Sequence, residues 1–223
     1  MGTAAPTPML TDTQILTLSQ WLSPAYPVGS FAYSHGLEAA VASGWLRDGN
    51  CLGAWLEDVL SRGAGFSDAL FLAAAYRAGN TEKLAEIDAT IRAFAASKER
   101  LFEATQQGSA FCAVTAAVWG DALAGLSYPV AMGRAAYLQD LPLHLTIKMY
   151  LLAFISNLVA ASQRLMAIGQ TEGQKIVRKL APACVQVAAR AETGNLSLLS
   201  STSFMIDIAS MQHETQHSRI FRT

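Results

Sequence analysis

The sequence predicts an all-α fold: a single globular domain of about ten helices that is expected to form a homodimer. Alanine and leucine dominate the whole chain, and no stretch shows the period-two alternation of a half-buried β-strand. Apolar runs of helical length are separated by short breaks that contain glycine, proline or asparagine. No change of composition marks a domain boundary, and 223 residues suffice for one large domain.

In the first half of the chain, the expected helices end at residues that interrupt a helix. Pro24 stops the first helix because proline cannot donate a backbone hydrogen bond. Gly44 suits the C-terminal cap of the second, and Gly63 and Gly79 end the next two. Thr81 is placed to cap a long helical run. The expected helices are 11–22, 35–43, 51–62, 67–78 and 82–107.

In the second half, glycine and proline again set the expected boundaries. A new helix is expected after Gly108, and Pro142 suits the first turn of another. Pro182 predicts a kink or break in the ninth helix. The expected helices are 109–119, 129–139, 142–166, 170–191 and 203–213, with a loop at 193–203. The apolar stretch 149–161 is shorter than the roughly 20 residues that span a bilayer, so we expect a buried core helix and no membrane anchor.

Composition narrows the function classes. Hydrophobic residues make up 52% of the chain and charged residues 15%, so we expect a partner, or a second copy, to cover part of the surface. The net charge of −1 argues against nucleic-acid binding. The three cysteines are scattered, which suits a reducing compartment and predicts a cytoplasmic protein. Residues 1–10 lack the features of a signal peptide and are expected to form a disordered tail.

The string HETQH, from His213 to His217, satisfies the H-E-x-x-H pattern of zinc proteases. In that pattern two histidines on one helical face bind zinc, and a glutamate, here Glu214, is the general base. Only SRIFRT follows, which holds no usual third ligand, although His35 or His144 could supply one. A weak metal site from His213 and His217 is a second interpretation. We favour a third, a solvated tail over residues 212–223 (the tail) that orders against a partner.

The stretch SPAYPVGSFAYSHGLE, residues 23–38, is named here the first signature. Its prolines and glycines predict a rigid loop that presents aromatic residues at the start of a helix. One interpretation is a structured turn with Ser34 as N-cap and Phe31 in the core. The other is a recognition surface, because rigid aromatic residues suit interfaces. Its candidate contact residues are Tyr33, Ser34, His35 and Glu38.

The stretch QRLMAIGQTEGQKIVRKL, residues 163–180, is named here the second signature. Gln170, Gln174 and Arg178 recur every four residues and form one polar stripe along a helix. Arg164, just before the Gly169 turn, could join that surface. The stripe is either a solvated helix face or a binding face with directional hydrogen-bond donors. The chain contains no nucleotide-binding glycine loop and no G-x-S-x-G elbow, so we expect no cofactor and no catalysis.

Three stretches in order resemble one family. The first signature resembles the N-terminal signature of the urease accessory protein UreF family. QRLMAIGQTEGQ is similar to that family's second signature, and HETQHSRIFRT resembles its C-terminal ending, H-E-T-Q-x-S-R-x-F-R-[ST]. Asp68 and the pair Tyr76 and Arg77 also stand where related sequences carry them. The resemblance covers the chain from about residue 11 to its last residue.

Two positions depart from the family pattern. Many relatives carry tyrosine where this chain has His217, so the zinc-protease string resembles a coincidence built on H-E-T-Q. The second signature often has proline where Ala167 stands. The alternatives kept open are a zinc-dependent hydrolase that uses His213, Glu214 and His217, and a nickel-binding metallochaperone that uses the two histidines.

The resemblance implies a function without catalysis. Proteins of this family are all-helical, cytoplasmic and dimeric, bind the accessory protein UreD (also called UreH) and the GTPase UreG, and help to deliver nickel to apo-urease. A role in gating GTP hydrolysis has been proposed for the family. We expect a helical domain over 11–211 and a partner-docking tail over 212–223. The expected partner-binding residues are Tyr33, Ser34, His35, Glu38, Arg164, Gln170, Gln174, Arg178, His213, Glu214, Gln216, Arg219, Phe221 and Arg222.

Overall fold

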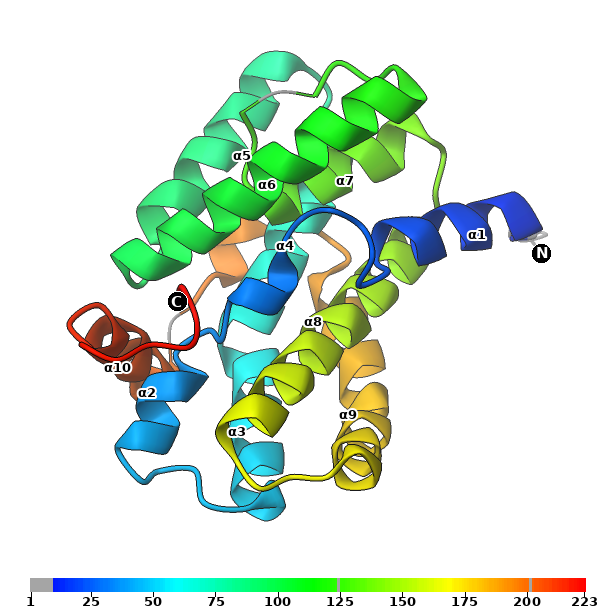
Figure 1. Cartoon of the computed structure of the whole chain (residues 1–223). Coiled ribbons are helices and arrows are strands. Elements are labelled where there is room, and N and C mark those ends of the chain that lie inside the picture. Colours follow the sequence, from blue (N-terminus) through cyan, green and yellow to red (C-terminus); the bar gives the residue numbers. More distant parts are fainter. Residues whose placement is uncertain (1–9, 124, 201) are drawn as a thin grey trace, which may run out of the picture.

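The computed structural model describes residues 10–123, 125–200 and 202–223, and it is helical throughout these ranges, with no strand (Figure 1). The all-α prediction is confirmed. The α-helices are α1 (Asp12–Trp21), α2 (Leu37–Ala42), α3 (Gly49–Arg62), α4 (Ala64–Tyr76), α5 (Thr81–Phe94), α6 (Lys98–Trp119), α7 (Tyr128–Leu138), α8 (Leu143–Leu165), α9 (Gln170–Ala191) and α10 (Phe204–His213), with 3-10 turns η1 (Ser30–Ala32) and η2 (Leu196–Leu198). The expected disordered tail, residues 1–10, lies almost wholly outside the described residues.

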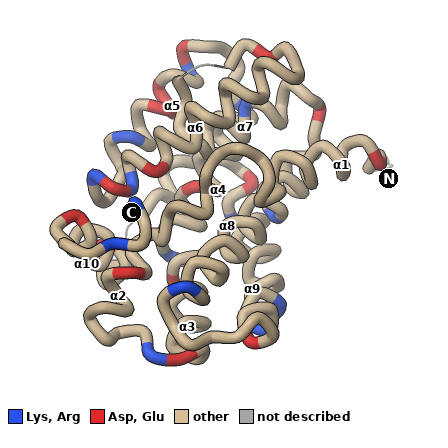
Figure 2. The backbone as a smooth tube through the Cα atoms, viewed as in Figure 1, with Lys and Arg blue, Asp and Glu red and all other residues tan. Residues whose placement is uncertain are grey.

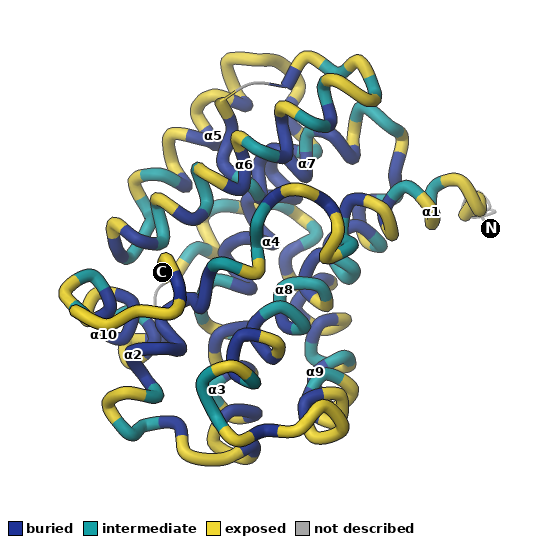
Figure 3. The backbone as a smooth tube through the Cα atoms, viewed as in Figure 1, coloured by how far each residue is buried: buried dark blue, intermediate teal, exposed yellow. Residues whose placement is uncertain are grey.

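Helix α4 is the centre of the fold. Every residue from Gly65 to Ala75 is buried, because α7, α3, α9 and α8 pack around it (Figure 3). The contact with α7 is especially close, since a Cβ on Gly133 would overlap the carbonyl oxygen of Leu72. Helix α8 has the length and composition of a membrane span, but half of its most apolar window is buried. It packs against α9 and α4, which confirms the prediction of a core helix.

An aromatic cluster attaches α1, which projects from the body at the right of Figure 1. The Trp21 ring lies 5.4 Å from the Phe111 ring in an edge-on arrangement. Tyr26 packs on Phe111, and its hydroxyl lies 2.8 Å from the Thr115 hydroxyl. Such aromatic pairs stabilise a fold beyond their buried area alone. The cluster therefore fixes the chain on both sides of the turn that follows α1.

Two predicted boundaries are wrong. The expected run 82–107 is two helices, because the backbone of Ala95 is extended and Ser97 caps a new helix by accepting the Arg100 N–H. Gly108 lies inside α6 and ends nothing. A Cβ at Gly108 would overlap the carbonyl oxygen of Leu126, so this glycine permits a loop to pass close to the helix.

Two smaller predictions also differ from the structure. Of the kink or break expected at Pro182, the break is absent: α9 is continuous across this proline, and it starts and ends where predicted. The expected helix at 35–43 starts later, at Leu37. His35 and Gly36 have left-handed backbone angles, with φ of 56° and 78°, which no α-helix contains.

Candidate functional site: the tail clasp

The first signature and the tail, almost two hundred residues apart in the sequence, lie against each other at the start of α6 (Figure 1). The Arg222 N–H donates to the Ala32 carbonyl oxygen at 2.8 Å. The Ser34 N–H and hydroxyl donate to the Thr223 carbonyl oxygen at 2.8 and 2.6 Å. Main-chain hydrogen bonds thus fix the tail to the first signature.

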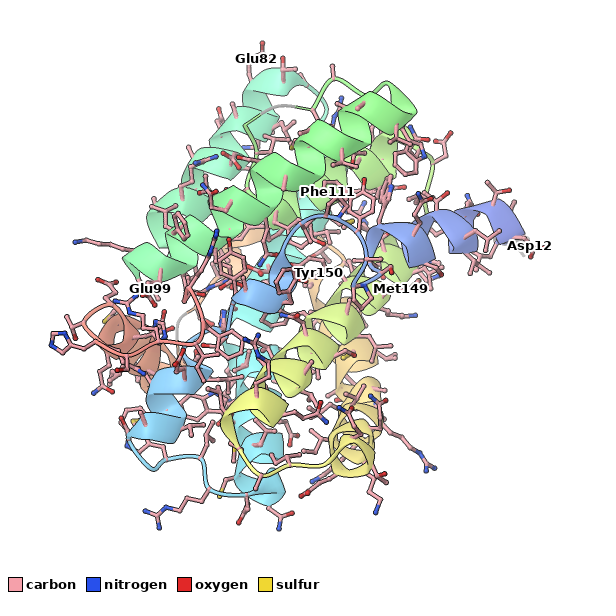
Figure 4. The ribbon with its side chains drawn as sticks, viewed as in Figure 1. Asp12, Glu82, Glu99, Phe111, Met149 and Tyr150 are labelled. Atoms are coloured by element: carbon pink, nitrogen blue, oxygen red, sulfur yellow. The ribbon has the colours of Figure 1, made fainter. Side chains whose placement is uncertain are left out.

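Three buried carboxylates bind groups of the tail. We name these carboxylates, together with the tail groups that they bind, the tail clasp. The carboxylates are those of Glu38, Glu99 and Glu103. All three are buried, and the last two lie one turn apart on α6. Figure 4 marks Glu99 at the α6 end nearest the chain terminus. Charged residues of both signs gather there, whereas few lie along α8 (Figure 2).

Glu38 binds the tail through three donors. One carboxylate oxygen accepts the Ile220 N–H at 2.7 Å, and the other accepts the Phe221 N–H at 2.9 Å. The second oxygen also lies 3.2 Å from Nε2 of His213. Adjacent backbone amides that share one carboxylate form a strong, charge-assisted contact. Glu38 therefore sets the backbone direction of the tail at residues 220 and 221.

His213 joins two carboxylates. Its Nδ1 lies 2.7 Å from Glu99, its Nε2 faces Glu38, and the ring has no exposed surface. Carboxylates accept hydrogen bonds, so both contacts are hydrogen bonds only when both ring nitrogens carry a proton. Arg219 donates to the other oxygen of Glu99 at 2.8 Å. The tail thus supplies both nitrogen-bearing side chains that face Glu99.

The structure does not support the zinc-protease interpretation of HETQH. Helix α10 ends at His213, so the two histidines do not share a helical face. His213 is buried between carboxylates, whereas His217 is exposed. Within the part of the chain that the structure describes, no group of three histidine, cysteine, aspartate or glutamate side chains could hold a metal ion. Glu214 instead accepts the Lys98 N–H at the start of α6, and so caps that helix.

A second ionic group lies beside the clasp, around Arg100. This guanidinium is 2.7 Å from Glu103 and 3.5 Å from Asp68. Burial is the largest influence on Glu103 and opposes its ionisation, but Arg100 and the nearby His35 together outweigh it and lower the pKa of Glu103 to about 2. Burial instead raises the pKa of Asp68, which is farther from the cation and accepts the Tyr150 hydroxyl at 3.0 Å. The nearer carboxylate is therefore the one that the guanidinium keeps charged.

His35 lies next to this group in a buried position. Burial and the Arg100 charge lower the pKa of His35, so its neutral form is favoured. Its Nδ1 and the Ser127 hydroxyl have no hydrogen-bond partner among the described residues. Both residues line a cavity of about 60 Å³, which has room for water. On the other side, Asp68 and Arg100 also line a wider, mostly apolar groove of about 590 Å³.

Arg164 connects the second signature to the tail and to the first signature. Its guanidinium lies over the Phe221 ring, 4.3 Å from the centroid, and donates to the Phe31 carbonyl oxygen at 3.1 Å. Gln170, Gln174 and Arg178 do not join it, because they are exposed on α9, on the opposite side of Figure 1 from α10. The second signature thus divides into one residue in the clasp and a separate surface stripe.

The expected partner-binding residues fall into two classes by exposure. The buried ones, which cannot touch a partner while the tail is closed, are Tyr33, Ser34, His35, Glu38, His213 and Phe221. Those with exposed or half-exposed surface are Arg164, Gln170, Gln174, Arg178, Glu214, Gln216, Arg219 and Arg222. Two expectations differ from the structure: the tail folds onto its own chain, and Phe31, expected in the core by one interpretation, is 70% exposed.

The sequence-based reasoning missed Glu99, Glu103 and Arg100. One signal was available, since Ser97 followed by Lys98 and Glu99 is typical of a capped helix start. That start would have placed both glutamates on one helical face. Nothing in the local sequence indicates that they face the tail.

Comparison with known proteins places the chain in a family. A family model described as UreF matches residues 46–181, more than half of the chain. The chain belongs to the UreF family. The match begins after the first signature and ends before the tail, so it covers helices α3 to α8, the first half of α9 and only part of the clasp.

Longer matches extend the similarity to almost the full chain. The urease accessory protein UreF of Ruegeria pomeroyi is 56% identical over 213 residues, which cover 96% of this chain and 98% of that protein. The proteins of the same name from Roseobacter denitrificans and Bradyrhizobium diazoefficiens are 50% and 42% identical. They align with 96% and 92% of this chain, and with 96% and 90% of their own length. The resemblance found in the sequence is confirmed.

Proposed function

We propose that this chain is a non-catalytic assembly factor for urease that bridges the accessory protein UreD, also called UreH, and the GTPase UreG. In this role it helps to insert nickel into apo-urease and regulates GTP hydrolysis. It acts in the cytoplasm as a homodimer. Family membership supports this proposal, because the similar proteins are named urease accessory proteins.

The main support for the proposal is that one half of the tail is buried and the other half is exposed. Its buried half closes onto the chain, while Ile220 is 57% exposed and Arg222 is exposed beside it. An apolar side chain next to an arginine is a common anchor in protein interfaces. The exposed half of the tail is therefore available to a partner without any opening of the fold.

The polar stripe on α9 offers a second contact surface. Gln170, Gln174 and Arg178 are all exposed, and they supply amide and guanidinium donors along one helix. Because the stripe and the tail lie on different sides of the molecule, the chain can hold two partners at once (Figure 1). This arrangement suits a bridging protein.

Deletion of residues 218–223 tests the proposal. We expect the shortened chain to fold, to fail to co-purify with the UreD-type protein and to leave urease inactive in cells. The parent chain, expressed at the same level, is the control. A shortened chain that still forms the complex with UreD-type and UreG-type proteins would refute the docking role of the tail.

Neither alternative function is supported by the geometry. A hydrolase or a metallochaperone built on His213 and His217 needs both rings at one metal ion, and α10 ends between them. Nickel titration of His217→Tyr is the corresponding check. We expect the parent and the variant to bind nickel equally, and loss of tight binding in the variant would restore the metallochaperone interpretation.

A further inference from the structure

Glu38 stands out among the residues of the tail clasp because, among the described residues, the recorded contacts of its carboxylate are all directed to the tail. It is only 6% exposed, and its carboxylate faces the Ile220 and Phe221 amides and the His213 ring. A partner cannot reach this carboxylate while the tail is in place. Any effect of Glu38 on binding must therefore pass through the tail.

The position of this carboxylate decides which tail side chains face outward. The backbone bends at Ile220 and Phe221, and one carboxylate that accepts both adjacent amides fixes the direction of that bend. Phe221 is turned inward, 3% exposed and covered by the Arg164 guanidinium. Its neighbours Ile220 and Arg222 are exposed, and the Arg222 side chain also contacts Tyr33.

The outward side chains lie next to a further exposed aromatic residue. Phe31 belongs to the first signature and is 70% exposed. Arg164 contacts both the Phe31 carbonyl and the Phe221 ring, and the Arg222 N–H donates to Ala32. Phe31, Ile220 and Arg222 are therefore exposed residues on two backbone segments that lie next to each other, although the segments are almost two hundred residues apart in the sequence. We name these three residues the display surface.

We propose that Glu38 is a positioning residue that presents the display surface to a protein partner, and this inference rests on the docking function proposed above. The partner that fits carries an apolar recess with a carboxylate at its edge. The recess takes the Phe31 and Ile220 side chains, and the carboxylate pairs with the Arg222 guanidinium. Charge complementarity selects an acidic edge, because Arg222 is the charged member of this surface.

The test compares Glu38→Gln with the parent chain and with Glu57→Gln, a control at an exposed glutamate on α3. The first measurement is hydrogen exchange in the isolated protein. We expect the Ile220 and Phe221 amides to exchange at least about tenfold faster in Glu38→Gln, while the amides of α4 are unchanged. Unchanged exchange at residues 220 and 221 would overturn the inference.

The second measurement is the affinity for the UreD-type protein in a double-variant cycle with Ile220→Ala. If Glu38 acts by presenting Ile220, the double variant binds no more weakly than the weaker of the two single variants. Fully additive losses would mean that Glu38 acts by another route, and would overturn the inference. If Glu38→Gln does not fold, Ser34→Ala replaces it, because that change removes one bond to the tail and leaves the buried charges paired.

The outcomes separate this inference from the proposed function. Deletion of residues 218–223 that leaves the complex intact refutes the docking role itself. A deletion that breaks the complex, together with unchanged exchange and binding in Glu38→Gln, refutes only the positioning role of Glu38.

Discussion

The tail clasp and the polar stripe on α9 are built from the same kinds of residue but use them differently. In the clasp, polar and charged side chains such as Glu38 and His213 are buried and bind one another. In the stripe, Gln170 and Gln174 are exposed on a regular helix whose opposite face packs on α3 and α8. Polar residues of a signature can therefore be buried and position the exposed residues above them, or they can be exposed and form the surface themselves.

The largest expected difference between the two regions is in stability. Glu99→Ala leaves the buried His213 ring and the half-exposed Arg219 without their shared carboxylate. Removal of one member of a buried charged group is costly, so we expect the free energy of unfolding to fall by about 3 kcal/mol. The matched change in the stripe, Gln174→Ala, should alter it by less than about 0.5 kcal/mol. Urea denaturation measures both. Equal values would remove the distinction between the two regions.

A pH series sharpens the comparison, because the Arg100 group beside the clasp contains His35 and the stripe contains no group that titrates near neutrality. The pKa of His35 is below its ordinary 6.5 in the folded chain. As the pH falls below about 6.5, the unfolded chain takes up a proton that folded His35 does not, so stability decreases. His35→Asn removes this group and suits the left-handed backbone at that position.

We therefore expect the free energy of unfolding to fall more steeply between pH 7 and pH 5 in the parent chain than in His35→Asn. Urea titrations at several pH values measure the two slopes. Identical slopes would show that His35 is not held neutral by its surroundings. At lower pH, protonation of Glu103, whose pKa is about 2, should remove further stability in both proteins.

The smallest expected change in stability is in the stripe. Replacement of Gln170, Gln174 and Arg178 by alanine removes no buried contact, so the free energy of unfolding should change by less than about 0.5 kcal/mol per substitution. Binding to the UreG-type or the UreD-type protein should weaken if the stripe is the second contact surface. A large loss of stability would mean that the stripe, like the clasp, supports the fold.

Helix positions were largely predictable because they depend on local signals. Helix α9 starts and ends as predicted, and α8 starts one residue after Pro142, which was expected in its first turn and is its N-cap residue. The errors arose where tertiary contacts decide the outcome. Gly108 interrupts nothing because a neighbouring loop needs the space that a side chain would fill, and only the folded structure shows that approach.

The site was predictable in its location but not in its construction. The first signature and the tail were both identified from the sequence, and the structure brings them together. Their contact depends on Glu99 and Glu103, whose sequence neighbours reveal only a helix start. The sequence of the tail also predicts a solvated segment, because a run of polar residues separates His213 from Phe221, which are both buried in the structure. Charged residues that pair over long sequence distances leave no repeating pattern in the sequence, so their contacts could not be predicted.

The buried half of the tail folds onto the chain, and we propose that its exposed half binds a partner. The most direct test is the affinity of Ile220→Ser for the UreD-type protein, with Val118→Ser on α6, at a similarly exposed apolar residue, as the control. We predict that Ile220→Ser binds at least about tenfold more weakly and unfolds at the same urea concentration as the parent, while Val118→Ser binds normally. Unchanged binding by Ile220→Ser would contradict the claim.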